Sequence, residues 1–467
     1  MESTDTPDRF PALLAATAMG VYLLLAVGAA TTLSDAVTAC AAWPACGDGL
    51  SLPSSAMGYV ALGHRAVALV VGVLALATGV LAWRRDTSTR IKAALGLSLL
   101  LYPAQAALGA FVATSGTTAT LSALHLVVGM TIFGGIVAAL AWTLEIETGD
   151  PDDRPDRMPE RDLPPAEDRR PEIPTSTVAR AKATANAYFR LMKPRLMWLL
   201  CLVASAAMAL AAGSDGLNPV TVAATLGGGA LSIGASGTFN HVLERDIDRR
   251  MNRTNDRPLV TDLVPVRNAI AWGLFLSVVS LALFASVNLL AAALGLAAIL
   301  FYSVVYTLIL KPNTVQNTVI GGAAGALPAL IGWAAVTDSI GLGGLVLAGV
   351  IFLWTPAHFY NLALAYKDDY ERGGFPMMPV VRGETVTRKH ILWYLGATLV
   401  AAAALAAADS LGWLYVLTGV VFGGIFLWMV VRLHYEQSES AAFRSFHASN
   451  AYLGALLLAV VVDALAI

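Results

Sequence analysis

Long apolar runs separated by polar loops dominate the hydrophobic pattern of this chain. A helix needs roughly 20 apolar residues to cross the hydrocarbon core of a bilayer. Thirteen segments reach about that length. They lie near 11–33, 58–83, 91–113 and 120–142, and, after a polar stretch, near 197–213, 219–240, 268–286, 288–310, 317–336, 340–360, 391–409, 411–431 and 448–466. The pattern predicts an all-α, polytopic membrane protein, a four-helix bundle followed by a nine-helix bundle.

The composition agrees with this class. Hydrophobic residues make up 57% of the 467 residues and charged residues 13%, whereas soluble domains carry about a quarter charged residues. This balance excludes a water-soluble enzyme, a disordered protein and a nucleic-acid binder, and it makes membrane lipid the expected surrounding. The first residues, MESTDTPDRF, lack the basic region of a cleaved signal peptide, so the first apolar run is predicted to be retained as a span.

The loop charges predict how the spans are oriented. Lys and Arg occur in every second loop, from Arg84 through Arg245 and Lys311 to Lys367 and Arg444, and the loops between them contain none. Cytoplasmic loops carry the excess of Lys and Arg. The alternation predicts a multi-pass protein of the cell membrane with its N-terminus in the cytoplasm and its C-terminus outside.

A polar segment separates the two groups of spans. Residues 145–174 hold eleven Asp or Glu, five Arg and seven Pro. Such a segment cannot bury an apolar face, and its prolines prevent a long helix. The predicted organisation is therefore a membrane domain at 1–144, a cytoplasmic linker at 145–178 and a second membrane domain at 179–467. An acidic docking role for the linker is the alternative.

One acidic stretch lies where a predicted span reaches the cytoplasm. Asn240, Glu244 and Asp248 are four residues apart, so on a helix they share one face. Oxygen ligands beside several arginines suit Mg²⁺ bridged to a phosphate group, because Mg²⁺ is usually held by one or two carboxylates plus substrate oxygens and arginine complements phosphate charge. The alternative is an ordinary charged loop that follows the positive-inside rule.

A second acidic cluster favours the metal site. Asp368 and Asp369 follow another span, also at the predicted cytoplasmic side, and His358 lies upstream in the same span. Ionisable groups near membrane depth are costly and point to function. Two carboxylate clusters at one depth, on helices far apart in sequence, predict a metal–diphosphate cage between them.

With these motifs in place, residues 188–466 resemble the UbiA-type intramembrane prenyltransferases, and within them the protoheme IX farnesyltransferases. The matching motifs are Lys193-Pro-Arg195, Asn240…Glu244-Arg-Asp246-Ile-Asp248…Met251-Asn-Arg253-Thr254…Arg257-Pro258-Leu259, Lys311, Thr355-Pro-Ala-His358-Phe and Asp369-Tyr-Glu-Arg-Gly-Gly-Phe-Pro376-Met-Met-Pro379. Two positions depart from the family pattern. Glu244 stands where Asp is usual, and Pro312 follows Lys311 where a basic residue is common.

The resemblance implies transfer of the farnesyl group of farnesyl diphosphate to a vinyl group of heme b, which gives heme O. It implies that Mg²⁺ is held by the side-chain oxygens of Asn240, Glu244, Asp248 and Asp369. It implies that the diphosphate is bound by the cationic residues Lys193, Arg195, Arg253, Arg257 and Lys311. His358 is the predicted contact of the heme, through its iron or a propionate, and a hydrogen bond from His358 to a neighbouring helix is the alternative.

The first four spans hold two histidines at one predicted depth. His64 and His125 each lie about six residues into a span that enters from outside, roughly 9 Å below the surface at 1.5 Å per residue. This placement suits heme held by two histidines between helices. The alternative is a pair of polar side chains that link helices.

The loop before His64 reads Cys40-Ala-Ala-Trp-Pro-Ala-Cys46. Its two cysteines could form either a disulfide or a redox-active thiol pair. With His64 and His125 it resembles half of a heme A synthase. Ala61 replaces an acidic residue of that family, and the family normally has two such halves. The resemblance leaves open a bound heme, a homodimer through this domain and a link to the assembly of heme-copper oxidases.

Two other functions remain as alternatives. The first is a prenyltransferase of the same fold that acts on a quinone or lipid acceptor. The second is a heme-handling membrane transporter, whose fold often shows inverted repeats with binding groups at mid-depth. The carboxylates here cluster at one face instead, which favours the enzyme.

Overall fold

The structure, a computed structural model, describes residues 9–32, 38–40, 42–46, 52–116, 118–153, 176–409 and 411–466. All regular structure within these ranges is helical, and thirteen of the described helices are long and apolar enough to cross a membrane. The predicted all-α, polytopic fold is confirmed. Most of the predicted linker, residues 154–175, lies outside the described residues.

The spans lie close to their predicted positions. They are α1 (Phe10–Thr32), α2 (Ala56–Arg84), α3 (Thr89–Ser115), α4 (Ala119–Thr148), α6 (Pro194–Ala212), α7 (Pro219–Leu243), α9 (Val266–Ala285), α10 (Leu289–Leu300) continued by the π-helical η3 (Phe301–Leu310), α12 (Asn317–Thr337), α13 (Leu342–Ala365), α16 (Glu384–Ala408), α17 (Trp413–Glu436) and α18 (Glu439–Ala466). Shorter elements are η1 (Thr38–Cys40), α5 (Thr177–Leu191), η2 (Gly213–Asp215), α8 (Arg245–Asp248), α11 (Lys311–Asn313), α14 (Lys367–Arg372) and α15 (Met378–Arg382).

Several spans begin at residues that can cap a helix. The side chains of Ser55, Thr118, Asn218 and Asn288 each accept a hydrogen bond from a backbone N–H in the first turn of the helix that follows. Such caps satisfy N–H groups that have no partner inside the helix. The largest difference from prediction is at α18, which begins at Glu439 instead of near 448, because its first turns bury small residues between exposed polar ones.

The chain divides into two compact units. The first comprises Met1–Asp150 and Arg388–Gln437, and the second comprises Pro151–Thr387 and Ser438–Ile467. The first unit therefore groups α17 and most of α16 with α1 to α4. The domain boundaries drawn from the polar segment between the two groups of spans describe a different division and stay a prediction.

Within the first unit, polar contacts connect the helices at several depths. Thr17 of α1 and Thr78 of α2 share a buried hydrogen bond of 3.1 Å. Glu145 of α4 forms an ion pair of 2.9 Å with Arg90 of α3 and a second ion pair with Lys389 of α16. A Cβ at Gly396 of α16 would approach within 2.8 Å of a Val137 side-chain atom of α4, so α16 packs directly on the first four helices.

Within the second unit, small residues allow the central helices to approach closely. Gly332 of α12 lies against the backbone of Ala204 on α6, where an added Cβ would come within 3.0 Å of the Ala204 Cα. Membrane helices often use small residues in this way, because lipid offers no hydrophobic advantage over a neighbouring helix. The same α6 surface buries Val203, Ala206 and Ala207 completely.

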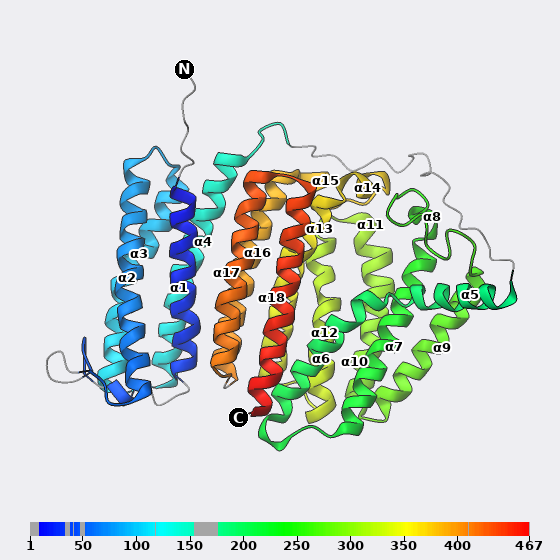
Figure 1. Cartoon of the computed structure of the whole chain (residues 1–467), viewed down its shortest axis with the longest axis horizontal. Helices are drawn as coiled ribbons and strands as arrows, with labels where there is room; N and C mark the ends of the chain where they lie inside the picture. Colours follow the sequence, from blue (N-terminus) through cyan, green and yellow to red (C-terminus); the bar gives the residue numbers. More distant parts are fainter. Residues whose placement is uncertain are drawn as a thin grey trace. The chain divides into compact units, whose positions relative to one another are not determined.

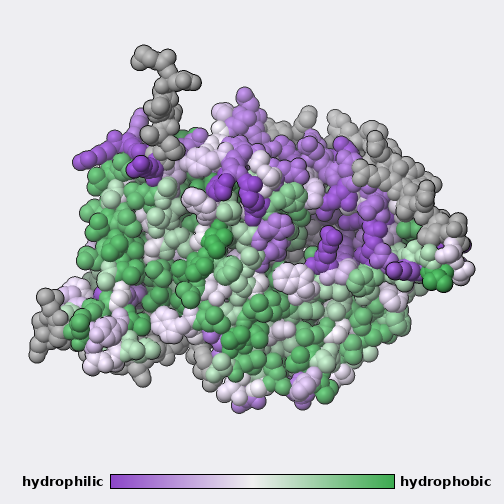
Figure 2. Space-filling model, viewed as in Figure 1, coloured by the Kyte–Doolittle hydropathy of each residue, from purple (hydrophilic) through white to green (hydrophobic). Residues whose placement is uncertain are grey.

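Polar elements gather at one end of the second unit. Figure 1 shows α8, α11, α14 and α15 at one end of the long helices of this unit. Helix α5 runs across the direction of these long helices. In Figure 2 hydrophilic side chains concentrate over the α8 and α14 end, whereas the sides of the helices are mostly hydrophobic. The two acidic clusters predicted from the sequence are on these elements.

Candidate active site

The first acidic cluster forms a continuous row. Helix α7 ends at Leu243, yet the Glu244 N–H still donates to the Asn240 carbonyl (2.9 Å) and the Asp248 N–H donates to the Glu244 carbonyl (2.8 Å). Helical spacing thus continues across the break between α7 and α8. The three residues are 2%, 3% and 1% exposed. We call Asn240, Glu244 and Asp248 the acidic row.

Three cationic side chains converge on the acidic row. Lys311 Nζ lies 2.6 Å from a Glu244 oxygen. One Arg257 Nη atom lies 2.6 Å from an Asp248 oxygen and 3.9 Å from a Glu244 oxygen, so it stands between the two carboxylates. Lys193 donates to the Asn240 side-chain oxygen and to the Tyr302 hydroxyl, the latter at 3.2 Å. The carboxylates of Glu244 and Asp248 thus both face the Arg257 guanidinium.

The electrostatics reflect this concentration of charge. Burial, reinforced by the Arg257 guanidinium, lowers the pKa of Lys193 to about 7. Burial raises the pKa of Glu244, but the Lys311 and Lys193 ammonium groups outweigh burial and hold it below its ordinary value. Burial and the Glu244 charge raise the pKa of Asp248 despite Arg257. A bound anion at the cationic side would counter the mutual repulsion of Lys193 and Arg257.

Asp369 joins the second acidic cluster to the first. It lies on α14, and its two oxygens accept the backbone N–H groups of Asn252 (3.0 Å) and Arg253 (2.8 Å). These amides belong to the loop that follows Asp248. Asp369 is 8% exposed, whereas its neighbour Asp368 is exposed to solvent. The predicted proximity of the two clusters is therefore present, with Asp369 fastening the loop beside the acidic row.

We expect Asp369→Asn to loosen this loop. An amide side chain offers one oxygen acceptor and faces the second N–H with a donor, so at least one charge-assisted hydrogen bond of about 1.5–3 kcal/mol is lost. Trypsin should then cleave faster after Arg249 and Arg250, as measured by mass spectrometry of the digest. Asp368→Asn is the matched control, and equal cleavage rates in both variants would contradict the anchoring role.

The remaining predicted cations lie differently. The Arg253 guanidinium lies 4.9 Å and 5.4 Å from the ring centres of Tyr366 and Tyr370, and its buried Nε has no hydrogen-bond partner among the described residues. Arg253 is thus held beside the loop, and its Nε–H is available to donate a further hydrogen bond. Arg195, in the first turn of α6, is exposed, and the structure gives it no polar contact with the acidic row.

Two further polar residues belong to this site: Tyr302, which the sequence did not indicate, and Thr307, which follows Tyr306 in a family motif but had no predicted role. Tyr302 contacts Lys193, and Thr307 accepts a 3.1 Å hydrogen bond from the Asn240 side-chain nitrogen. Both lie in η3, a π-helical segment within a predicted span. Residues five apart do not share a face in an α-helix, so ordinary helical spacing does not pair them. Local π-helix within a longer helix is frequent at functional sites, but no residue pattern signals it here.

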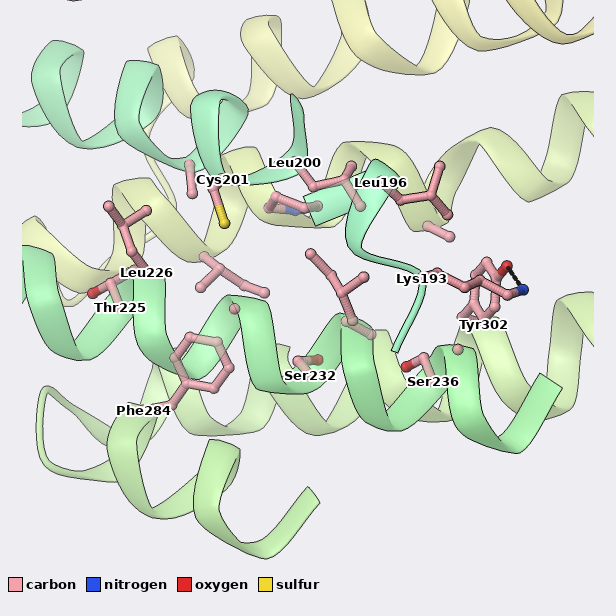
Figure 3. A pocket seen from close by; sticks show the side chains of 18 residues that line it. Lys193, Leu196, Leu200, Cys201, Thr225, Leu226, Ser232, Ser236, Phe284 and Tyr302 are labelled. Atoms are coloured by element: carbon pink, nitrogen blue, oxygen red, sulfur yellow. Dashed lines mark hydrogen bonds between the residues drawn. The ribbon is translucent and has the colours of Figure 1, made fainter. Parts of the chain in front are cut away.

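An apolar pocket opens from the acidic row into the helices. Figure 3 shows Lys193 and Tyr302 at one end and Thr225, Leu226 and Phe284 at the other. Its lining follows α7 from Gly237 to Thr225, a run of twelve residues, or about 18 Å at 1.5 Å per residue. Most side chains along it are hydrophobic. The pocket therefore joins a charged mouth to a long dry interior.

His358 lies between α13 and α18. Its Nδ1 is 2.6 Å from the Ser449 hydroxyl, and that hydroxyl donates its proton to the Phe446 carbonyl (2.7 Å). The histidine must then donate through Nδ1, which leaves the lone pair on Nε2. Trp354 and Phe446 stack on the ring, with centroids 4.2 Å and 4.3 Å away. The interhelical hydrogen bond considered as an alternative is therefore present.

The two histidines of the first unit lie on α2 and α4. His64 and His125 are close enough to interact electrostatically, and the Nδ1 atom of each is buried without a hydrogen-bond partner among the described residues. A glycine leaves room for the His125 ring, because a Cβ at Gly109 would lie 3.1 Å from it. Gln105 donates to the His125 carbonyl at 2.9 Å.

The loop before α2 is closed and held by one arginine. Cys40 and Cys46 form a disulfide. Arg65, next to His64, donates through one Nη atom to the carbonyls of Ala42, Pro44 and Ala45 (2.7–3.2 Å) and through the other to the Cys40 carbonyl (2.7 Å). The disulfide loop is thereby fixed to the turn of α2 that carries His64.

Comparison with known proteins defines the class. Residues 198–454 match the UbiA prenyltransferase family, and residues 54–163 match a family described as cytochrome oxidase assembly proteins. The chain belongs to the UbiA prenyltransferase family, as the motifs predicted. A solved structure described as digeranylgeranylglyceryl phosphate synthase is 14% identical with a TM-score of 0.51 and covers 61% of this chain and 99% of its own, which shows a common fold.

Within that family the relatives point to one branch. A protoheme IX farnesyltransferase of Haloquadratum walsbyi is 62% identical over 98% of this chain and 97% of its own. Protoheme IX farnesyltransferase 1 of Saccharopolyspora erythraea is 48% identical over 59% of this chain and 89% of its own. The predicted resemblance to this branch is confirmed.

Proposed function

We propose that this chain transfers the farnesyl group of farnesyl diphosphate to a vinyl group of heme b and so produces heme O. The observation that carries the proposal is the acidic row with its cations at the mouth of the apolar pocket. The names of the relatives support the two substrates. The acidic row, its cations and the residues that line the pocket all belong to the second unit, so the transfer site is assigned there.

The donor set fits a magnesium ion that is shared with the substrate. Asn240, Glu244, Asp248 and Asp369 offer only oxygen ligands, which Mg²⁺ prefers. The described residues contain no group of three or more acidic, histidine or cysteine side chains arranged to hold a metal by themselves. One or two carboxylates plus diphosphate oxygens is the usual arrangement. When bound, the ion neutralises charge that develops on the leaving diphosphate.

The residues of the chain perform the remaining steps. Lys193, Arg257 and Lys311 bind the diphosphate and stabilise the charge that grows as the allylic C–O bond breaks. The apolar pocket holds the farnesyl tail and keeps water from the cation. The terminal vinyl carbon of heme b then bonds to farnesyl C1, water adds to the neighbouring carbon, and a proton and diphosphate are released. The Nε2 lone pair of His358 is the proposed contact of the heme.

The first unit is proposed to hold a heme between His64 and His125. The support is the pair of buried Nδ1 atoms, which have no partner in the described part of the chain, and the space that Gly109 leaves for His125. Only one four-helix unit of the two-half family is present, so a homodimer would supply the second half. The match of residues 54–163 to cytochrome oxidase assembly proteins supports a role in the maturation of heme-copper oxidases.

The membrane orientation is also a proposal. The Lys- and Arg-containing loops support an orientation with the acidic row, the N-terminus and the linker at the cytoplasmic face of the cell membrane and the C-terminus outside. The disulfide between Cys40 and Cys46 lies on the opposite side by this count, in the compartment where disulfides persist.

Membranes containing the full chain should convert heme b and farnesyl diphosphate to heme O. Chelation with EDTA should abolish product formation, and added Mg²⁺ should restore it, because the donor set relies on a shared ion. Chromatography of extracted heme measures the product. Prenylation of an aromatic or lipid acceptor without heme O would favour the quinone-type alternative. Heme transport without any prenyl transfer would favour the transporter.

A further inference from the structure

An aromatic side chain, Phe284, lines the end of the pocket opposite Lys193. Phe284 of α9 is fully buried, and Thr225, Leu226 and Ile331 line the pocket beside it (Figure 3). Glycines hold the ring from two helices: a Cβ at Gly228 of α7 would lie 3.1 Å from it and a Cβ at Gly295 of α10 would lie 2.5 Å from it. With a helix surface on each side, the ring has little room to turn aside.

The depth of the pocket matches three isoprene units. The farnesyl main chain has twelve carbons, and eleven C–C bonds of ~1.5 Å extend to about 14 Å. A geranylgeranyl chain adds four carbons and reaches about 19 Å by the same bond lengths. Along α7, Gly237 at the mouth and Gly228 beside the Phe284 ring are nine residues apart, or about 14 Å at 1.5 Å per residue. Three units fit with C1 at the mouth, and the fourth meets Phe284.

We propose that Phe284 sets the length of the prenyl chain by closing the pocket behind the third isoprene unit. This inference rests on the proposed function, because it takes the pocket as the site of the prenyl tail. It assigns Phe284 the role of a specificity-determining residue. Gly228 and Gly295 act through it by holding the ring in place.

Gly229 offers a second way to change the depth. It lines the pocket on α7, eight residues or about 12 Å from Gly237. A Cβ added there meets no atom within 4 Å. A larger side chain at this position therefore extends into the pocket without a clash at its base, and replacing a helical glycine does not weaken the helix. Such a side chain removes the space of the third unit.

The free thiol of Cys201 on α6 can report whether the pocket is occupied, without catalytic turnover. Cys201 lines the pocket about 12 Å along α6 from Lys193. It is the one cysteine of the three that is outside the disulfide. In the wild-type chain, farnesyl diphosphate should protect Cys201 from N-ethylmaleimide. Dimethylallyl diphosphate, with one isoprene unit, should leave it reactive, because its tail ends before Cys201.

The decisive experiment compares diphosphates of different length in variants of the full chain. Phe284→Ala should raise the use of geranylgeranyl relative to farnesyl diphosphate at least about tenfold, measured as the mass of the prenylated heme. Gly229→Phe should lower the use of farnesyl diphosphate at least about tenfold and keep the use of geranyl diphosphate. Phe426→Ala, a buried phenylalanine of α17, and Gly229→Ala are the matched controls.

The outcomes separate the two proposals. If Phe284→Ala does not fold, Gly229→Phe and the Cys201 protection series still test the pocket depth. Heme prenylation with unchanged chain-length preference in both variants, or equal protection by both diphosphates, would overturn the role of Phe284 and leave the transfer itself standing. Absence of prenylated heme with every diphosphate in the wild-type chain would instead overturn the proposed function.

Discussion

Asp248→Asn is expected to lower kcat/KM for farnesyl transfer by about 10²–10³-fold, the range found when one preorganised electrostatic group is removed from a site. Asp248 is 1% exposed and forms a 2.6 Å ion pair with Arg257. The asparagine keeps the shape of the side chain but loses the charge that contributes to the magnesium site. It also loses the carboxylate that positions the Arg257 guanidinium.

The control for this variant lies two residues earlier. Asp246→Asn removes the same charge from the same helix α8, but the Asp246 side chain is 86% exposed and forms a 3.5 Å ion pair with Arg249. We expect it to retain activity within about twofold, since exposed pairs contribute little. Steady-state formation of heme O measures both variants, and thermal melting checks that each is folded. Full activity in Asp248→Asn would remove this residue from the metal site.

His64→Ala is expected to abolish heme binding by the first unit and to leave farnesyl transfer intact. Two imidazoles are proposed to ligate one heme, so loss of either removes the six-coordinate, low-spin absorption spectrum. In purified chain loaded with heme b, the low-spin signal should fall to less than about a tenth of its wild-type size, because a truncated ligand leaves its metal site incomplete. His125→Ala should behave in the same way.

The matched control is a histidine outside the proposed site. His447 of α18 is exposed, and His447→Ala should leave the spectrum of the first unit unchanged. A low-spin spectrum that survived in the His64→Ala, His125→Ala double variant would show that these residues are not the ligands. A parallel loss of heme O formation would show that the two units do not act separately, against the assignment of the transfer site to the second unit.

The spans and the acidic row followed from simple periodicities. Thirteen apolar runs were predicted and thirteen such helices are present in the described part of the chain. Asn240, Glu244 and Asp248 share a side because i to i+4 hydrogen bonds continue through the break after Leu243. Sequence spacing thus predicts the features that are formed within a single helix.

Features that depend on several helices could not be predicted in this way. The acceptance of two backbone amides by Asp369 requires the loop after Asp248 to fold against α14. The contact of Tyr302 with Lys193 depends on π-helical geometry within an otherwise ordinary span. Arg195 has the charge expected of a diphosphate ligand, but its position at the start of α6 leaves it exposed.

Helix α17 and most of α16 belong to the same compact unit as the first four helices, and this has a consequence for biosynthesis. Residues 388–437 leave the ribosome after every helix of the second unit except α18. Domains generally fold as they are synthesised, N-terminal first. Here the earliest helices must stay in the bilayer with incomplete packing until translation has almost finished. Biogenesis of the first unit is therefore a late event, although its sequence begins the chain.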